Sequence, residues 1–214
     1  ETGIYVMGDD ASSNFPYFGA NFWEDWERPI HFEILEENLS GYSANAGVKI
    51  FGGWSRGQNQ KSLSIFARSK YGYSSFEYPL FPDSEISAYE SFVLRNSGND
   101  WTSSMLRDGF ITGLADNTDI DHQLYRPAVI YLNGEYWGIQ NIREKVNEHF
   151  LSSHHDIPSE HIDLLDIQGT NPENIVHGTN IDYLNLLDYL SNNDIEDPSV
   201  QSGIEGWIDI NSFM

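Results

Sequence analysis

The chain has 214 residues, of which 33 are acidic and 11 are Lys or Arg, so its formal net charge at pH 7 is −22. This charge argues against a nucleic-acid partner, because an acidic surface repels the phosphate backbone. The sequence has no cysteine, which excludes disulfides, thiolate metal sites and a thiol nucleophile, and no stretch approaches the roughly 18 apolar residues of a membrane span.

The first half of the chain has the alternation of apolar and polar residues that is typical of β-strands. Ile30, Phe32 and Ile34 alternate with polar residues, which predicts a half-buried strand. Before this strand, an aromatic segment through Trp26 is expected to be irregular. Strands are expected over residues 4–7, 29–35, 46–52, 61–69 and 90–96.

The spacing of apolar residues becomes helical after residue 102, and a helix is expected over residues 103–115. Thr102 or Ser103 is expected to cap its N-terminus, and Gly109 to allow close packing against a neighbour. The apolar face that we expect to be buried consists of Met105, Leu106, Phe110, Ile111 and Leu114.

Residues 126–142 predict a β-hairpin, because Asn133-Gly134 tolerates the positive φ angles of a type I′ turn. From Arg143 onward, the pattern predicts helices. The expected fold class is therefore α+β: an antiparallel β-rich N-terminal part with one packed helix, then the hairpin and a helical C-terminal part.

Two groups of residues are candidates for a metal site. His154, His155 and Asp156 lack the helical spacing of a zinc site, and the acidic stretch 116–121 lacks the glycine and distal glutamate of an EF-hand. A polar transition from helix to loop explains the first group, and a solvated turn, with a loose cation site as the alternative, explains the second, so no metal ligand is assigned. A serine hydrolase is disfavoured, because the sequence has no Gly-x-Ser-x-Gly motif.

The stretch 51–62, FGGWSRGQNQKS, is the candidate phosphate-binding segment. It lacks the spacing of a P-loop, but a glycine-rich turn followed by a strand that opens with a lysine is how protein kinases cover nucleotide phosphates. Arg56, Lys61, Arg68 and Lys70 concentrate positive charge here in an acidic chain. A glycine-rich hairpin with solvated basic residues explains the same composition.

Residues 94–101, LRNSGNDW, are polar where a strand is expected to give way to the helix. Asn99 and Asp100 are good N-terminal capping residues, and a helix N-terminus also attracts anions. Arg95 and Arg107 are candidates for buried ion pairs with Glu144 or Asp108, which would fix geometry without a catalytic role.

Four ordered motifs together resemble the CotH family, which is named for a spore-coat protein kinase. The resemblance covers roughly residues 28–190 and is strongest to secreted bacterial members. It implies an atypical kinase-like fold and transfer of phosphate from ATP to Ser of a secreted or surface protein, with a divalent cation such as Mg²⁺. The motifs are GVKIFGGWSRGQNQKSLSIFARSKYG, FEYPLFPD, FVLRNSGNDW…MLRDGF and QLYRPAVIYLNGEYWGIQNIREKVNEHFL.

The resemblance implies roles for particular residues. Lys61 is similar in position to the lysine that contacts nucleotide phosphates, and the turn with Gly53 and Arg56 would lie beside them. The helix over 103–115 would take the place of a kinase regulatory helix. The hairpin would lead into a hinge and place Glu144 near the nucleotide.

The family also has an Asp- and Asn-rich segment that supplies metal-binding and catalytic carboxylates, and this chain shows only a faint echo of it at 207–211. We therefore expect one CotH-like domain over 1–214 that is truncated at its C-terminus and inactive alone. Its expected parts are a lead-in over 1–27, a nucleotide-binding-like lobe over 28–142 and the start of a helical part over 143–214.

Two further expectations complete this picture. A cysteine-free chain tolerates oxidation, which favours an extracellular or cell-surface location on a bacterium. The alternative function is a non-catalytic extracellular module that binds carbohydrate or protein, with the aromatic rings of residues 14–26 as a stacking surface for sugars.

Overall fold

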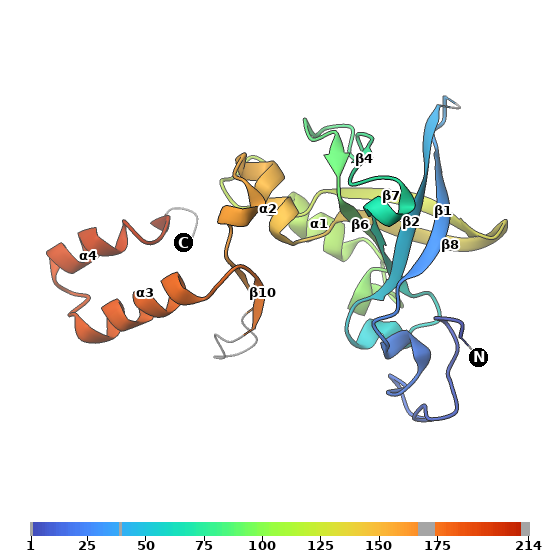
Figure 1. The fold of residues 1–214 in the computed structure, drawn as a ribbon, viewed down its shortest axis with the longest axis horizontal. Helices are drawn as coiled ribbons and strands as arrows, with labels where there is room; N and C mark the ends of the chain where they lie inside the picture. The colour runs from blue at the N-terminus through green and yellow to red at the C-terminus, as the bar shows by residue number, and fades with distance from the viewer. Residues whose placement is uncertain (1, 39, 167–173, 211–214) are drawn as a thin grey trace. The chain divides into compact units, whose positions relative to one another are not determined.

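The structure is a computed structural model that describes residues 2–38, 40–166 and 174–210. The chain forms two compact units: residues 1–114 with 122–145, and residues 115–121 with 146–214. Figure 1 shows the elements of both units. Within the described ranges, no helix is long and apolar enough to cross a membrane.

The first unit is built on a six-stranded antiparallel sheet. A two-stranded sheet of β4 (Phe76–Glu77) and β5 (Ala88–Tyr89) accompanies it, as do the 3-10 turns η1 (Asn21–Trp23), η2 (Trp54–Gly57), η3 (Ser69–Tyr71) and η4 (Gly98–Asp100). In spatial order, the strands are β1 (Arg28–Leu35), β2 (Gly41–Phe51), β3 (Ser62–Phe66), β6 (Ser91–Arg95), β8 (Glu135–Glu144) and β7 (Tyr125–Leu132).

The two faces of this sheet differ in polarity because side chains alternate along each strand. One face carries the apolar core, in which Val48, Ile65 and Phe92 are cross-strand neighbours. The opposite face carries Ser64, then Val93 and Arg143 in register across β3, β6 and β8. The predicted half-buried positions of Ile30, Phe32 and Ile34 are confirmed, whereas the expected strand over 4–7 is wrong, since these residues form a turn and coil.

The hairpin of β7 and β8 confirms the predicted turn, with φ of 53° at Asn133 and 83° at Gly134. The prediction of a helix from Arg143 is wrong for residues 143–147, because β8 continues through Glu144 and α2 begins only at Glu148. The cause is the length of the partner strand: β7 begins at Tyr125, which lies opposite Arg143. Arg143 and Glu144 are consequently buried rather than on a solvated helix.

Helix α1 (Arg107–Gly113) is shorter than expected. Thr102 and Ser103 do not cap it; instead, the Asp100 carboxylate accepts hydrogen bonds from the backbone N–H groups of Arg107 and Ser104. Its predicted buried face is wrong, because four of those residues are more than half exposed: Leu106, Phe110, Ile111 and Leu114. Close packing at Gly109 is confirmed, since a Cβ there would lie 2.5 Å from the Tyr125 ring.

The second unit contains the predicted helices in a shorter form. Asn147 and Asp197 cap α2 and α4 by accepting hydrogen bonds from the N–H groups of Phe150 and Ser199. The elements are α2 (Glu148–His155), η5 (Ser159–His161), β9 (Leu164–Leu165) paired with β10 (Ile175–His177), α3 (Ile181–Asn192) and α4 (Pro198–Ile204). An antiparallel sheet followed by helices confirms the α+β class.

Candidate functional site

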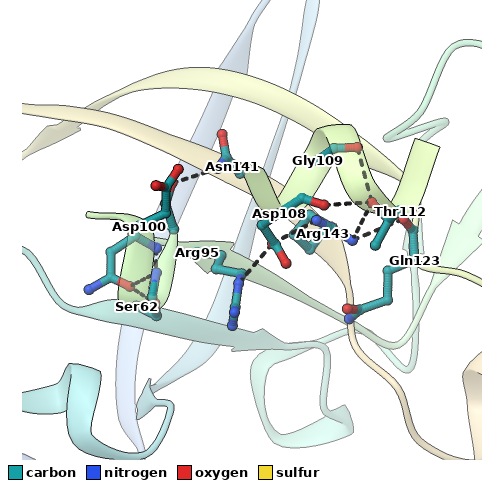
Figure 2. A network of polar contacts seen from close by, with 12 residues as sticks. Ser62, Arg95, Asp100, Asp108, Gly109, Thr112, Gln123, Asn141 and Arg143 are labelled. Carbon is teal, nitrogen blue, oxygen red and sulfur yellow. Dashed lines mark hydrogen bonds and ion pairs between the residues drawn. The ribbon is translucent and has the colours of Figure 1, made fainter. Parts of the chain in front are cut away.

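The polar face of the sheet carries an ion-pair network between the central strands and α1 (Figure 2). One carboxylate oxygen of Asp108, on α1, accepts hydrogen bonds from Arg95 Nε on β6 at 2.9 Å and from Arg143 on β8 at 2.7 Å. The Arg143 side chain is fully buried, while those of Arg95 and Asp108 are 32% and 25% exposed. The network therefore joins a buried cation to a partly accessible one.

Arg143 also contacts the last turn of α1 and the loop that follows this helix. Its guanidinium donates to the Thr112 hydroxyl at 3.2 Å and to the backbone carbonyl of Gln123 at 3.1 Å. Burial lowers the pKa of Arg143, and the nearby Asp108 carboxylate opposes this effect. The guanidinium keeps its charge because a carboxylate and two neutral oxygens accept hydrogen bonds from its terminal nitrogens; its buried Nε has no hydrogen-bond partner among the described residues.

A second polar cluster fixes the loop between β6 and α1. Asn96 is fully buried: its side-chain carbonyl accepts from the Ser62 hydroxyl, and its amide donates to the Gln60 carbonyl. The Asn141 amide donates to the Ser97 hydroxyl at 3.0 Å. Ser97 has a φ of 66°, a left-handed conformation that is uncommon for a non-glycine residue and therefore has to be held by its surroundings.

Lys61 lies immediately before β3, and its ammonium contacts the glycine-rich turn rather than Asp108. It donates to the backbone carbonyls of Arg56 and Gln58 at 2.7 and 2.9 Å and lies 3.7 Å from the centre of the Phe22 ring. Burial lowers the pKa of Lys61 to about 8. Because Phe22 belongs to the apolar core, the ammonium lies on the core side of the sheet.

Arg56 and Gly53 lie in the same turn as the carbonyls that Lys61 contacts. Arg56 donates through Nε to the Gly52 carbonyl and through a terminal nitrogen to the Phe22 carbonyl at 3.1 Å. Gly53 accepts from the Arg56 N–H at 3.0 Å, and space is open where its Cβ would be. The structure thus brings together three of the four predicted nucleotide-binding residues. Their role in binding stays a prediction.

Glu144, the fourth predicted nucleotide-binding residue, is the last residue of β8. The Gln140 side chain donates to the Lys61 carbonyl, and Glu144 is four residues further along the strand, or about 13 Å at 3.3 Å per residue. Its carboxylate accepts from the Leu124 N–H at 3.0 Å. Glu144 is therefore separated from the glycine-rich turn, and its nucleotide role also stays a prediction.

The sequence indicated Asp108 as one possible partner of Arg95, but not the burial of Arg143 or Asn141. The available signal was the hairpin register: counting outward from Asn133-Gly134 pairs Tyr125 with Arg143 once the bulge between Ile130 and Tyr131 is included. Across the described ranges, there is no group of three His, Asp or Glu side chains arranged to hold a metal ion.

Comparison with known proteins supports the resemblance seen in the motifs. No curated protein matches this chain. A family model described as CotH kinase protein matches residues 48–214, which include the glycine-rich turn, the Arg95–Asp108–Arg143 network and the second unit. The match covers most of the chain, and the protein therefore belongs to the CotH family.

Proposed function

We propose that this chain is the nucleotide-binding part of a CotH protein kinase, which transfers the γ-phosphoryl group of ATP to a serine of a secreted or surface protein in bacteria. In this transfer, the bond from phosphorus to ADP breaks and the bond to the serine oxygen forms, with loss of the hydroxyl proton. The observation that carries the proposal is the Arg95–Asp108 ion pair between a central strand and a helix.

Protein kinases hold the lysine that contacts the nucleotide phosphates with a glutamate from a helix packed on the sheet. Arg95 and Asp108 are a cation and a carboxylate in the same kind of arrangement. Arg95 uses only its Nε–H for Asp108, and within the described residues its terminal nitrogens have no hydrogen-bond partner. A guanidinium fork of this kind suits the bidentate geometry of phosphate.

The distribution of charge supports an anionic ligand in the first unit. Every Lys and Arg of this acidic chain lies in that unit. The first unit holds 11 basic and 17 acidic residues, whereas the second holds 16 acidic residues and no Lys or Arg, so the first unit repels a polyphosphate less than the second does. Mg²⁺ is proposed to arrive with the nucleotide, because it is usually held by phosphates and only one or two carboxylates. The described residues hold no preformed cluster for it.

The test is calorimetric titration of the chain with a non-hydrolysable ATP analogue and Mg²⁺. Arg95→Met is expected to weaken binding by about 10- to 100-fold, because a charge-assisted hydrogen bond contributes about 1.5–3 kcal/mol. Arg68→Met is the control, since Arg68 is a more exposed arginine that pairs with Glu27. Lys61→Met in the same titration tests the predicted phosphate role of that lysine.

The proposal fails if the unmodified chain binds no nucleotide, or if Arg95→Met and Arg68→Met bind it equally well. If only Lys61→Met loses affinity for the ATP analogue and this variant is still folded, the phosphates bind at the glycine-rich turn instead.

A second candidate function, carbohydrate binding, is favoured by an exposed aromatic cluster. Phe15, Phe18 and Trp54 are 46%, 51% and 64% exposed, and the Trp54 ring contacts both phenylalanines. Trp23, which also belongs to the aromatic segment 14–26, is partly buried and donates its indole N–H to the Pro16 carbonyl. Large amphipathic rings that remain exposed provide a surface on which sugar rings stack.

If this cluster binds sugars, glycan-array binding is expected to fall by about tenfold or more in Trp54→Ala, since burying a large apolar side chain contributes about 1.5–3 kcal/mol. Trp207→Ala, an exposed tryptophan of the second unit, is expected to leave binding unchanged. Absence of any signal across plant and microbial polysaccharides would eliminate this function.

A further inference from the structure

Arg143 stands out among the basic residues of the first unit because its side chain has no exposure to solvent. Its position on β8 is opposite Val93, two residues from Arg95 along β6. Both guanidinium groups meet at the same carboxylate oxygen of Asp108 (Figure 2). A charge placed so deeply serves its neighbours rather than a ligand in solvent.

The contacts of Arg143 extend along α1 and beyond it. Besides Asp108, the guanidinium binds Thr112 in the last turn of α1 and the carbonyl of Gln123 after the helix. One side chain on β8 therefore holds α1 at two points and the connection to β7 at a third.

Polar contacts are prominent in holding α1 because its apolar side chains do not face the sheet. Phe110 and Ile111 are 66% and 56% exposed, whereas Gly109 packs on the Tyr125 ring. Without a buried apolar stripe, the helix lacks the usual source of tertiary stabilisation. The position of Asp108 over the sheet therefore depends on polar contacts: those of Arg143, the ion pair with Arg95 and the Asp100 carboxylate at the start of α1.

We infer that Arg143 is a positioning residue for nucleotide binding: it fixes α1 and Asp108 so that Arg95 presents its terminal nitrogens to the phosphates. This inference rests on the proposed function. If Arg143 is removed, Asp108 keeps a single cationic partner and α1 loses its buried contacts to β8. Arg95 is then drawn into a closer pair with Asp108, away from the ligand.

The first experiment is a double-mutant cycle on the affinity of the chain for a non-hydrolysable ATP analogue with Mg²⁺. Arg143→Met is expected to weaken binding by about tenfold, within the range of coupling energies between contacting residues. In the Arg95→Met background, Arg143→Met is expected to have no further effect on affinity, because Arg143 affects nucleotide binding only by positioning Arg95. Arg143→Lys is expected to recover part of the affinity, since it keeps the charge but not the fork.

The matched control is Arg126→Met. Arg126 lies on β7 in the same sheet and pairs with Glu36, with a side chain that is 22% exposed. Its loss is expected to lower stability without changing nucleotide affinity. Additive effects of Arg95→Met and Arg143→Met, or an affinity loss in Arg126→Met equal to that in Arg143→Met, would overturn the inference.

The second experiment is independent of nucleotide. Hydrogen exchange of the α1 amides in the ligand-free chain is expected to quicken in Arg143→Met and, less strongly, in Arg143→Lys, but not in Arg126→Met. Unchanged exchange in α1 would overturn the inference even if nucleotide binds. If the unmodified chain binds no nucleotide, the proposed function fails. Faster exchange of the α1 amides in Arg143→Met would still support the part of the inference that Arg143 holds α1 in place.

Discussion

Asp108→Ala is expected to lower the free energy of unfolding by about 3 kcal/mol or more. The substitution leaves the fully buried Arg143 without its carboxylate, and breaking a buried ion pair by removing one partner costs about 3–5 kcal/mol. Arg95 loses its partner at the same time, so nucleotide affinity is expected to fall as well. Urea denaturation followed by tryptophan fluorescence measures the first effect, and calorimetry the second.

Asp25→Ala is the appropriate control for this result. Asp25 pairs with Lys49 at 2.9 Å, but its side chain is 86% exposed, and exposed pairs contribute about 0–1 kcal/mol. Asp108→Asn is expected to fall between wild type and Asp108→Ala, because the amide oxygen still accepts a hydrogen bond without its charge. Equal stabilities of the Asp108 and Asp25 variants would show that the network is not structural.

Lys61 is expected to make the stability of the protein depend on pH above neutrality. Burial lowers its pKa from 10.5 to about 8 in the folded chain, so the unfolded state holds more protons between these values. The free energy of unfolding therefore rises with pH in this window. The cost of the buried charge is present in full below about pH 8 and is gone above about pH 10.5. The full change is about 3 kcal/mol, at roughly 1.4 kcal/mol per pKa unit.

Other groups titrate in the same range, so the measurement is the difference between the wild type and Lys61→Met in urea denaturation from pH 7 to 10.5. Relative to this variant, the wild type is expected to gain stability as pH rises. Lys49→Met, which removes a lysine paired with an exposed aspartate, is expected to show no such gain. A flat difference for Lys61→Met would mean that its ammonium is solvated rather than buried against Phe22.

The strand and turn predictions succeeded where the evidence was local. Ile30, Phe32 and Ile34 alternate over half-buried positions, and Asn133-Gly134 adopts the positive φ angles that its sequence favours. The helix prediction at 103–115 failed at its start because the Asp100 carboxylate, rather than Thr102 or Ser103, receives the N–H group of Arg107. Several acceptors near a helix start compete, and only the folded loop selects one of them.

The predicted site likewise combines residues that are close in sequence with residues that only the folded chain brings together. Arg56, Gly53 and Lys61 lie together, as neighbours within nine residues of sequence are expected to, but their contacts are with backbone carbonyls and the core. Glu144 lies elsewhere on β8. Arg95, Asp108 and Arg143 come from segments up to 48 positions apart, and no local pattern states that one oxygen of Asp108 accepts from both arginines.

By itself, the sequence determined the α+β class, the hairpin, the family and the concentration of basic residues before residue 146, because these depend on residue type, spacing and order along the chain. The tertiary structure decided which face of the sheet each cation occupies. Lys61 falls on the core side, while Arg143 and Arg95 meet at Asp108 on the opposite side. A shift of one residue in register would exchange the two faces, and register is set by pairing between distant strands.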